Sequence, residues 1–325
     1  MSGPHPAVAA VRSAVRRSLS SLPVDSTVLV ACSGGADSLA LAGAVAFEAP
    51  RAGRRAGAVT VDHGLQEGSA ERAESVAKVL GGLGLDPVLV RAVEVSGRGG
   101  PEAAARHARY AALEDAVAEQ APAAVLLGHT LDDQAETVLL GLARGSGARS
   151  LAGMAPRSGH YLRPLLDIDR GTVREACDRM GLEAWEDPHN LDPRFARSRV
   201  RHKVLPVLER ELGPGIAAAL ARTAGMLRAD ADTLDLFADE LFTDAVAWTP
   251  GPELAVAPLK AAPDALRTRV LRRAALAAGC PSGALTARHV RELDRLVTDW
   301  RGQAHIDLPG GVRGRRVADR ILLDR

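Results

Sequence analysis

Residues 26–38 read Ser26-Thr27-Val28-Leu29-Val30-Ala31-Cys32-Ser33-Gly34-Gly35-Ala36-Asp37-Ser38, and a run of apolar and small residues, 39–47, follows directly. An uncharged segment rich in β-branched residues, then a glycine pair and an apolar run, is typical of a strand, a tight turn and a helix N-terminus. Gly34 and Gly35 have no Cβ, so the backbone there can adopt left-handed angles and approach an anion closely. The first turn of the helix would offer unpaired N–H groups and the positive end of its dipole. The stretch therefore predicts a phosphate-binding loop.

The same loop carries polar side chains that suit a nucleotide. Ser33 and Ser38 would add hydroxyl donors for phosphate oxygens. Asp37 does not fit a bare anion site, but a carboxylate beside a polyphosphate is expected where Mg²⁺ lies between them. The alternative is an ordinary glycine turn with a serine cap, and a glycine pair alone would indicate no more. The full Ser-Gly-Gly-x-Asp-Ser string, which lacks the Gly-Lys-Ser/Thr of a Walker loop, favours an ATP site.

The composition is that of a globular protein: 325 residues, of which 46% are hydrophobic. With 41 basic and 40 acidic residues the formal charge is +1, so a nucleic-acid partner would have to be held by a local patch. The three cysteines form no Cys-x-x-Cys pair, which argues against a disulfide framework and against a zinc or iron–sulfur site, and favours a reducing cytoplasm. The longest clean apolar run, 39–47, is too short to span a bilayer, and no membrane partner is expected.

Strand and helix patterns alternate through the first part of the chain. Further strands are predicted at 56–61, 87–95 and 123–127, and helices at 69–80, 101–113, 138–143 and 170–180. An amphipathic first helix is predicted by the helical spacing of Val8, Val11, Val15 and Leu19. This alternation implies a Rossmann-like parallel sheet with right-handed crossovers.

A boundary is predicted at Gly213-Pro214-Gly215, which divides the chain into a domain of residues 1–213 and a domain of residues 214–325. The second domain begins with a long helix that reaches about residue 248, and residues 254–325 read as a small α+β unit. No catalytic constellation is visible there, so a recognition role and a purely structural role both stay open.

Ligands of parallel sheets bind at the carboxyl ends of the strands, near the point where the strand order reverses. The second predicted strand ends in Asp62 and His63, and His63 would either contact the nucleotide or cap the strand. The fourth ends in Gly128 and His129. These residues are therefore expected near the phosphate-binding loop.

Three acids gather in the first turns of the helix after the fourth strand: Asp132, Asp133 and Glu136. A capping box of Thr130 and Asp133, helped by the helix dipole, explains one acid well. It does not explain three, because like charges so close repel each other unless a cation lies among them. The alternatives for that cation are Mg²⁺ and the ammonium group of an amine substrate.

Two arginine-bearing segments are candidates for an RNA contact. The predicted helix 101–113 carries Arg109 beside Tyr110, in a chain with only 3% aromatic residues. The one dense basic segment contains Arg194, Arg197, Arg199, Arg201, His202 and Lys203. Helical spacing would place Arg194, Arg197 and Arg201 on one face. A positive stripe of this kind is typical of phosphate binding, and a solvated helix face is the alternative.

Taken in order, these motifs resemble the tRNA(Ile)-lysidine synthetases, a branch of the N-type ATP pyrophosphatases that share a PP-loop. The matching segments are residues 33–38, 62–65, 102–110, 128–147, 163–166 and 185–206. The loop alone is shared with thiolases and amide-forming synthetases, whereas the ordered set is specific. Ser198 departs from the family, in which asparagine often stands between two arginines. The resemblance implies a Rossmann-like parallel sheet of the PP-loop ATP pyrophosphatase type, followed by a smaller helical or α+β C-terminal domain.

The resemblance also implies a reaction, the ligation of L-lysine to C2 of the wobble cytidine of a tRNA(Ile) with a CAU anticodon. ATP with Mg²⁺ would adenylate the C2 oxygen, and the lysine ε-amine would then displace AMP. The product, lysidine, pairs with A, so decoding changes from AUG to AUA. Positioning and charge neutralisation would supply most of the rate enhancement.

The roles implied by the resemblance follow residue by residue. ATP would be bound by Ser33, Gly34, Gly35, Ala36, Asp37, Ser38, His63 and His129. Mg²⁺ would be bound by Asp37 and Asp132, and the lysine by Asp133 and Glu136. The catalytic set would be Asp37, Arg109, Asp133 and Glu136, with Arg109 at the cytidine. The tRNA would be bound by Arg194, Arg197, Arg199, Arg201 and Lys203.

Three other functions stay open at this point. A tRNA thiolase on the same scaffold would generally need reactive or paired cysteines, and Cys32 has no partner nearby in the sequence. A small-molecule amide-forming synthetase would release pyrophosphate without any tRNA. A non-catalytic, nucleotide-dependent RNA-binding module would not need the acid cluster. The sequence leaves the oligomeric state open, with a homodimer as one candidate.

Overall fold

The structure, a computed structural model, describes residues 3–64, 66, 68–95, 100–145, 147–187, 191–249 and 251–325. It divides into two compact units, Met1–Leu227 and Arg228–Arg325. The division predicted from the sequence, after residue 213, falls just before helix α10 (Ile216–Ala245), and the compact units divide within that helix. Among the described residues, no helix combines the length and apolar character needed to cross a membrane.

The N-terminal unit is built on a six-stranded sheet with the order β3-β2-β1-β4-β6-β5. The strands are β1 (Thr27–Ala31), β2 (Ala56–Asp62), β3 (Val88–Ala92), β4 (Ala123–Leu127), β5 (Arg157–Ser158) and β6 (Tyr161–Leu162). All neighbouring pairs are parallel except the edge pair of β5 and β6. The prediction of a mostly parallel sheet is therefore confirmed. The short antiparallel edge was not predicted.

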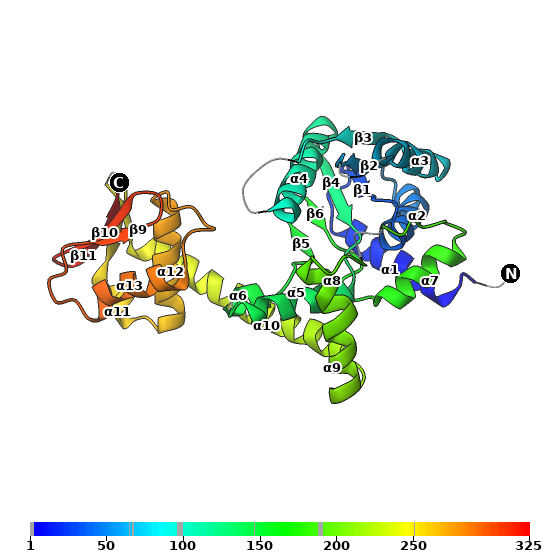
Figure 1. Cartoon of the computed structure of the whole chain (residues 1–325). Helices are drawn as coiled ribbons and strands as arrows, with labels where there is room; N and C mark the ends of the chain where they lie inside the picture. The colour runs from blue at the N-terminus through cyan, green and yellow to red at the C-terminus, as the bar shows by residue number, and fades with distance from the viewer. Residues whose placement is uncertain are drawn as a thin grey trace. The chain divides into compact units, whose positions relative to one another are not determined.

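The helices of this unit are α1 (Pro6–Ser20), α2 (Ala36–Arg51), α3 (Ser69–Gly82), α4 (Pro101–Glu119), α5 (Leu131–Ala143), α6 (Ala148–Leu151), α7 (Arg170–Arg179), α8 (Ala196–Arg199), the π-helical turn η2 (Val200–Val204) and α9 (Leu205–Leu212). Helices α1, α2, α3 and α7 cover one face of the sheet and α4 covers the other, whereas α5, α6, α8 and α9 lie beyond one end of it (Figure 1). The predicted first helix is confirmed, because its four apolar residues are all buried in α1.

Side chains of β1 alternate between two apolar cores, as the period of a strand requires. Val28 and Val30 join the core formed with α1, α2 and α7, whereas Leu29 joins the core that includes Leu113 of α4. The strand is thus covered on both sides, which explains its continuous apolar sequence. The strand order runs from β1 to β2 and β3 on one side and to β4 on the other. The carboxyl end of β1 therefore lies at the switch point of the sheet.

The C-terminal unit packs helices against a five-stranded antiparallel sheet with the order β7-β8-β11-β10-β9. Its elements after α10 are β7 (Val246–Trp248), β8 (Pro252–Ala255), α11 (Val256–Ala261), α12 (Asp264–Ala277), α13 (Ala287–Thr298), β9 (Ile306–Leu308), β10 (Val312–Val317) and β11 (Arg320–Asp324). Leu254, Leu271, Leu293 and Ile321 are fully buried in its core. The predicted small α+β unit is confirmed.

Candidate active site

The turn between β1 and α2 has the geometry of an anion-binding loop. Gly34 has φ +83°, and a Cβ placed on it would lie 2.7 Å from Cγ2 of Val76. Gly35 has ordinary negative φ and is the N-cap residue of α2. The left-handed conformation predicted for the glycine pair is therefore adopted by Gly34 alone. The first turn of α2 points its N–H groups out of the sheet edge at the switch point.

The two serines of the loop differ in orientation. The Ser38 hydroxyl donates to the Gly35 carbonyl oxygen at 2.9 Å and accepts from the Ser33 backbone N–H at 3.2 Å. Ser38 is buried, whereas Ser33 is exposed. In this conformation Ser38 braces the loop from inside, and Ser33 is the hydroxyl open to a ligand.

Asp37, in the first turn of α2, carries an unpaired carboxylate oxygen. Its Oδ1 is buried and has no hydrogen-bond partner, and its Oδ2 lies 3.6 Å from Nε of Arg170. Burial raises the pKa of Asp37 to about 6, against the opposing effect of Arg170, and nearby Asp133 raises it further. A buried oxygen without a partner is costly, so this group fits a position beside a bound cation.

The acids at the start of α5 are neutralised by arginines of the same chain. Asp133 completes the predicted capping box, because its Oδ2 accepts the Thr130 N–H at 2.8 Å. Its Oδ1 accepts from Arg170 at 2.8 Å and from Arg201 at 3.1 Å. In the structure, therefore, the cations among the acids are guanidinium groups. The sequence suggested Mg²⁺ or the ammonium group of an amine substrate as the cation among the acids. It did not suggest arginines of the same chain.

Glu136 lies at the centre of this cluster and has no exposed surface. Its carboxylate lies 2.7 Å from Nε of Arg201, 3.1 Å from Nε of Arg197 and 3.3 Å from Nη1 of Arg170. The pairing follows from packing, because Ala135 of α5 contacts the buried part of η2 and α9 and so aligns α8 and η2 with α5. We call Asp133, Glu136, Arg170, Arg197 and Arg201 the acid–arginine cluster.

Asp132 points away from this cluster, toward the start of α7. Its Oδ2 accepts the backbone N–H of Arg170 at 2.7 Å. Among the described residues, no group of three or more His, Cys, Asp or Glu side chains is arranged to hold a metal ion. Mg²⁺ bound by Asp37 or Asp132 would therefore need phosphate oxygens or water as its remaining ligands.

The two histidines and Arg109 reach the same edge of the sheet from β2, β4 and α4. Nδ1 of His63 and Nδ1 of His129 are buried without a partner. Burial lowers the pKa of His129 to about 3 and also lowers that of His63, with Arg109 adding to the effect on both. Both rings are therefore neutral near pH 7. Burial likewise lowers the pKa of Arg109.

The basic segment 194–203 is divided by the structure into two groups. Arg197 and Arg201 point into the acid–arginine cluster, whereas Arg194, Arg199 and Lys203 are exposed. Arg194 lies before α8 begins and pairs with Asp192 at 2.7 Å. The predicted helical face shared by Arg194, Arg197 and Arg201 was therefore wrong with respect to Arg194.

Arg170 is the residue of this site that sequence reasoning missed. It was placed only at the start of a helix, yet it lies within 4 Å of Asp37, Asp133 and Glu136. The sequence offered one indication of Arg170: three clustered acids predict that a cation lies near them. It did not indicate which residue supplies that cation. Leu65, Ser146 and residues 188–190, which belong to the matching segments, lie outside the described residues, as does the Glu102 side chain.

The fold and the loop define a class of protein. The profile of the PP-loop domain matches residues 10–208, and that of the TilS substrate binding domain matches residues 254–322. A U34-tRNA thiolase from Methanococcus maripaludis superposes with a TM-score of 0.55 at 20% identity, over 68% of this chain and 79% of that chain. That likeness concerns the fold alone. The N-terminal unit is thus a PP-loop ATP-binding domain.

Curated relatives narrow the class to one family. The chain is 66% identical to a tRNA(Ile)-lysidine synthase from Thermobifida fusca and 57% identical to one from Streptomyces coelicolor, over 99% of each chain. It is 50% identical to one from Mycobacterium tuberculosis, over 89% of this chain and 86% of that one. The chain therefore belongs to the tRNA(Ile)-lysidine synthase family. The resemblance drawn from the ordered motifs is confirmed.

Proposed function

We propose that this protein ligates L-lysine to C2 of the wobble cytidine of a tRNA(Ile) with a CAU anticodon, at the expense of ATP. The proposal rests mainly on three features that lie together at one edge of the sheet. They are the PP-loop, the Asp37 oxygen without a hydrogen-bond partner, and the acid–arginine cluster. Family membership supports the same reaction.

The reaction has two steps that balance without an oxidant or reductant. In the first, the cytidine O2 attacks the α-phosphorus of ATP, and pyrophosphate leaves. In the second, the lysine ε-amine attacks C2, AMP leaves with that oxygen, and the nitrogen loses a proton. The Gly34–Gly35 turn, Ser33 and the α2 N-terminus would hold the phosphates, and neutral His63 and His129 can each donate or accept one hydrogen bond there.

The donors present at the loop fit a magnesium ion. We assign Asp37 as its protein ligand because the buried Oδ1 has no other partner, and Asp132 as a second ligand through Oδ1. When bound, Mg²⁺ would neutralise charge on the leaving pyrophosphate. Arg170 lies 3.6 Å from Asp37 and partly neutralises its charge.

The acid–arginine cluster suits an amino acid better than acids alone would. A lysine molecule carries both ammonium and carboxylate groups, and the cluster offers a carboxylate and guanidinium groups at contact distance of one another. The side chain of Asp133 is 11% exposed and that of Glu136 is fully covered. We therefore propose that Asp133 contacts the lysine ammonium, and that Glu136 acts on lysine by holding Arg197 and Arg201 in position.

The RNA would reach the site through two sets of arginines. Arg109, which lies near both histidines, is the candidate contact of the cytidine and of the charge that develops on it. The exposed residues Arg194, Arg199 and Lys203 are left to bind the RNA backbone. Arg197 and Arg201, which were also predicted to bind tRNA, are engaged with Glu136 and would contribute mainly through the lysine site.

The cysteines do not favour the thiolase alternative. Cys32, Cys177 and Cys280 are all free and buried. Burial raises the pKa of each thiol, to about 11 for Cys177, and so disfavours the reactive thiolate. Free, unreactive thiols also agree with a reducing cytoplasm, where we place the reaction. A homodimer stays a prediction, which light scattering of the purified protein would check.

The test is a transfer assay with ATP, labelled lysine and a transcript of tRNA(Ile) bearing CAU. We expect label in the RNA only when all three are present, with one AMP and one pyrophosphate per lysine. A tRNA(Met) transcript with the same anticodon is the control for substrate choice. Pyrophosphate release without tRNA would favour an amide-forming synthetase, and sulfur incorporation into tRNA would favour a thiolase. Either outcome would contradict the proposal.

A further inference from the structure

A cavity of the N-terminal unit lies on the outer side of α2, away from the PP-loop. It has a volume of about 540 Å³ and lies between α1, α2 and α7. Phe47, which lines it, is about 16 Å along α2 from the residues of the loop. Of the side chains that line it, three are arginines and one is a histidine, Arg12, Arg51, Arg179 and His5, and none is acidic.

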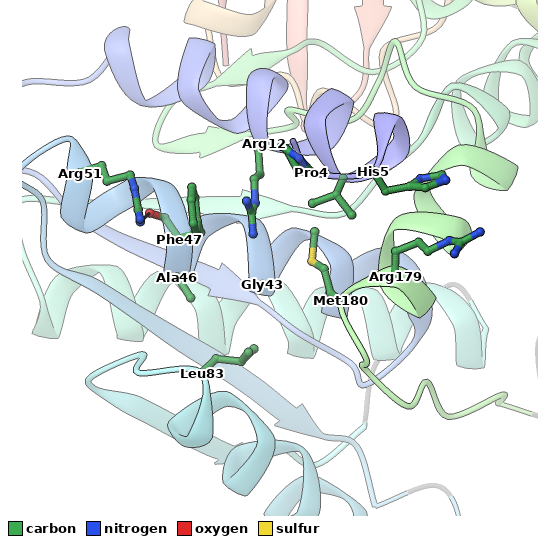
Figure 2. A pocket seen from close by; sticks show the side chains of 11 residues that line it. Pro4, His5, Arg12, Gly43, Ala46, Phe47, Arg51, Leu83, Arg179 and Met180 are labelled. Atoms are coloured by element: carbon green, nitrogen blue, oxygen red, sulfur yellow. Dashed lines mark hydrogen bonds between the residues drawn. The ribbon is translucent and has the colours of Figure 1, made fainter. Parts of the chain in front are cut away.

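Two arginines of this cavity enclose an aromatic ring. The Phe47 ring lies between the side chains of Arg12 and Arg51 (Figure 2), and each guanidinium carbon lies 3.5 Å from the ring centroid. Stacking on the ring fixes the plane of both guanidinium groups. Arg51 is exposed and Arg12 is half-buried, so both groups can be reached from solvent.

Neither guanidinium is neutralised within the described part of the chain. Nε of Arg12 is buried without a hydrogen-bond partner. The nearest acid, Glu48, is buried and accepts two hydrogen bonds from Arg16 instead, at 2.9 Å each. Arg51 donates only to the backbone oxygen of Phe47. Burial, and then the proximity of Arg51, lower the pKa of Arg12 despite the pull of Glu48. Two cations beside one carboxylate, which Arg16 already engages, leave an excess of positive charge that favours an anion.

The other end of the cavity differs, because its charges are compensated and its surface is apolar. His5 and Arg179 share Glu175, at 3.4 and 3.6 Å. Met180 lines the cavity near Arg179, and Leu83 lies below Ala46, toward the Phe47 side (Figure 2). The cavity therefore combines an uncompensated dicationic end with an apolar floor. A bare phosphate would use only the first of these features.

We propose that this cavity binds a nucleotide, with its phosphate at Arg12 and Arg51 and its base against the apolar floor. Arginine planes and phosphate-binding forks are the groups that recognise nucleotides in this way. The nucleotide has two sources, an unpaired residue of a bound RNA or a free mononucleotide. The site is separate from the reaction centre, and only the RNA source rests on the proposed function.

The test uses the full-length protein and the double variant Arg12→Gln, Arg51→Gln. The matched control is Arg17→Gln, which removes an exposed arginine from the same helix outside the cavity. In the first arm, AMP is titrated calorimetrically. In the second, binding of the tRNA(Ile) transcript is measured over a series of salt concentrations.

If the cavity binds a free mononucleotide, we expect two classes of AMP site in the wild type and in Arg17→Gln. We expect one class in the double variant. An RNA residue as ligand predicts that tRNA affinity falls about tenfold in the double variant. The salt slope would then drop by about two. If the double variant matches Arg17→Gln in both arms, the proposal is wrong.

A second pair of substitutions covers a failure of the double variant to fold. Arg12→Lys, Arg51→Lys keeps both charges but removes the planar groups that stack on Phe47. The proposal then predicts that AMP or tRNA binding at this site weakens at least threefold while the salt slope is preserved. Wild-type affinity for both AMP and tRNA in this variant would overturn it.

Discussion

Two arginine–carboxylate clusters, one in each unit, resemble each other in composition and differ in burial and in how completely their hydrogen bonds are satisfied. In the C-terminal unit, Arg267 is 5% exposed, whereas the side chain of its partner Asp264 is 90% exposed. All the guanidinium nitrogens of Arg267 have partners. Nε donates to Asp294 at 2.6 Å, Nη2 to Asp264 at 2.5 Å, and Nη1 to the Ala262 oxygen at 2.8 Å. The hydrogen bond with Asp294 is the largest influence on the pKa of Arg267, which is raised.

The acid–arginine cluster of the N-terminal unit is incomplete by the same measure. Nε of Arg170 and Nε of Arg197 are buried and make no hydrogen bond, although each faces a carboxylate, that of Asp37 at 3.6 Å and that of Glu136 at 3.1 Å. Among the described residues, nine buried side-chain atoms lack a hydrogen-bond partner, and all belong to the N-terminal unit. Those on the elements of the candidate site belong to Asp37, His63, Tyr110, His129, Arg163, Arg170 and Arg197.

This difference in hydrogen bonding distinguishes an ion-pair cluster that stabilises the fold from one that is suited to bind a ligand. Buried polar groups in native proteins are normally paired, so a group of exceptions in one place needs an explanation. Clusters of such groups at the carboxyl edge of a parallel sheet are expected where a substrate supplies the missing partners. The Arg267 cluster, by contrast, is complete without any ligand.

The largest effect is expected from Glu136→Gln, which removes the central charge of the incomplete cluster. Three arginines would lose their common partner, and breaking a buried pair costs about 3–5 kcal/mol of folding free energy. Asp294→Asn is the matched control, because Arg267 would keep Asp264 and the Ala262 oxygen and lose about 1.5 kcal/mol. Urea unfolding followed by fluorescence measures both. Equal losses in the two variants would remove the distinction between the clusters.

Asp133→Asn should separate lysine binding from ATP binding. The amide preserves the size of the side chain but removes the charge that faces both Arg201 and the proposed lysine ammonium. We expect the KM for lysine to rise about 30-fold or more, with the Kd for ATP changed less than about twofold. Steady-state kinetics and equilibrium binding give the two values. An unchanged KM for lysine would refute the assignment of Asp133.

The pH dependence of stability should reveal the burial of Asp37. Its pKa is about 6 in the folded protein, above its ordinary value of 3.8. Between these values the native state binds more protons than the unfolded chain, so this group lowers stability as pH rises from about 4 to 6. Asp37→Asn removes that effect. The variant should gain about 1–2 kcal/mol relative to the wild type between about pH 4 and pH 7, allowing for partial exposure.

Urea unfolding of both proteins at several pH values checks this sign. A stability difference that is independent of pH would show that Asp37 is ionised in the folded protein over this range. The effect of Arg170 on the pKa of Asp37 would then outweigh the effect of burial.

The smallest effect is expected from Arg199→Ala, and it should contrast with Arg201→Ala. Arg199 donates only to the carbonyl oxygens of Pro193 and Arg194 in the described structure, so its charge is available to RNA. Its removal should weaken tRNA binding about threefold and reduce the salt slope by about 0.9. Arg201→Ala should mainly raise the KM for lysine. If Arg201→Ala alone flattened the salt dependence, the division of the basic segment would be wrong.

Much of the fold could be predicted from local patterns, because those patterns report which faces are buried. The β-branched run of β1, the helical spacing in α1 and the Thr130–Asp133 capping box each act within a few residues. The β5–β6 edge could not be predicted this way, because strands of two residues are too short to show a period.

Many residues of the candidate site could be named from the sequence, but the contacts between their side chains could not. Gly34, Asp37, His129 and Asp133 were expected at strand ends, and the structure brings them to one edge. The partners of Glu136 could not be foreseen, because Arg201 is 65 residues away in the sequence and reaches α5 only through the packing of Val200 and Leu205. The directions of the side chains could not be predicted from the sequence either. Ser38 is turned into the loop, whereas Ser33 is exposed.

We infer that ATP and lysine use adjoining but separable halves of one site. To test this, the tRNA(Ile) transcript is incubated with ATP labelled in the α-phosphate, without lysine, and the label retained on the RNA is measured. We expect adenylated RNA with the wild type and with Asp133→Asn and none with Asp37→Asn. Added lysine should discharge the adenylate in the wild type alone. Adenylate lost in Asp133→Asn, or formed normally in Asp37→Asn, would contradict it.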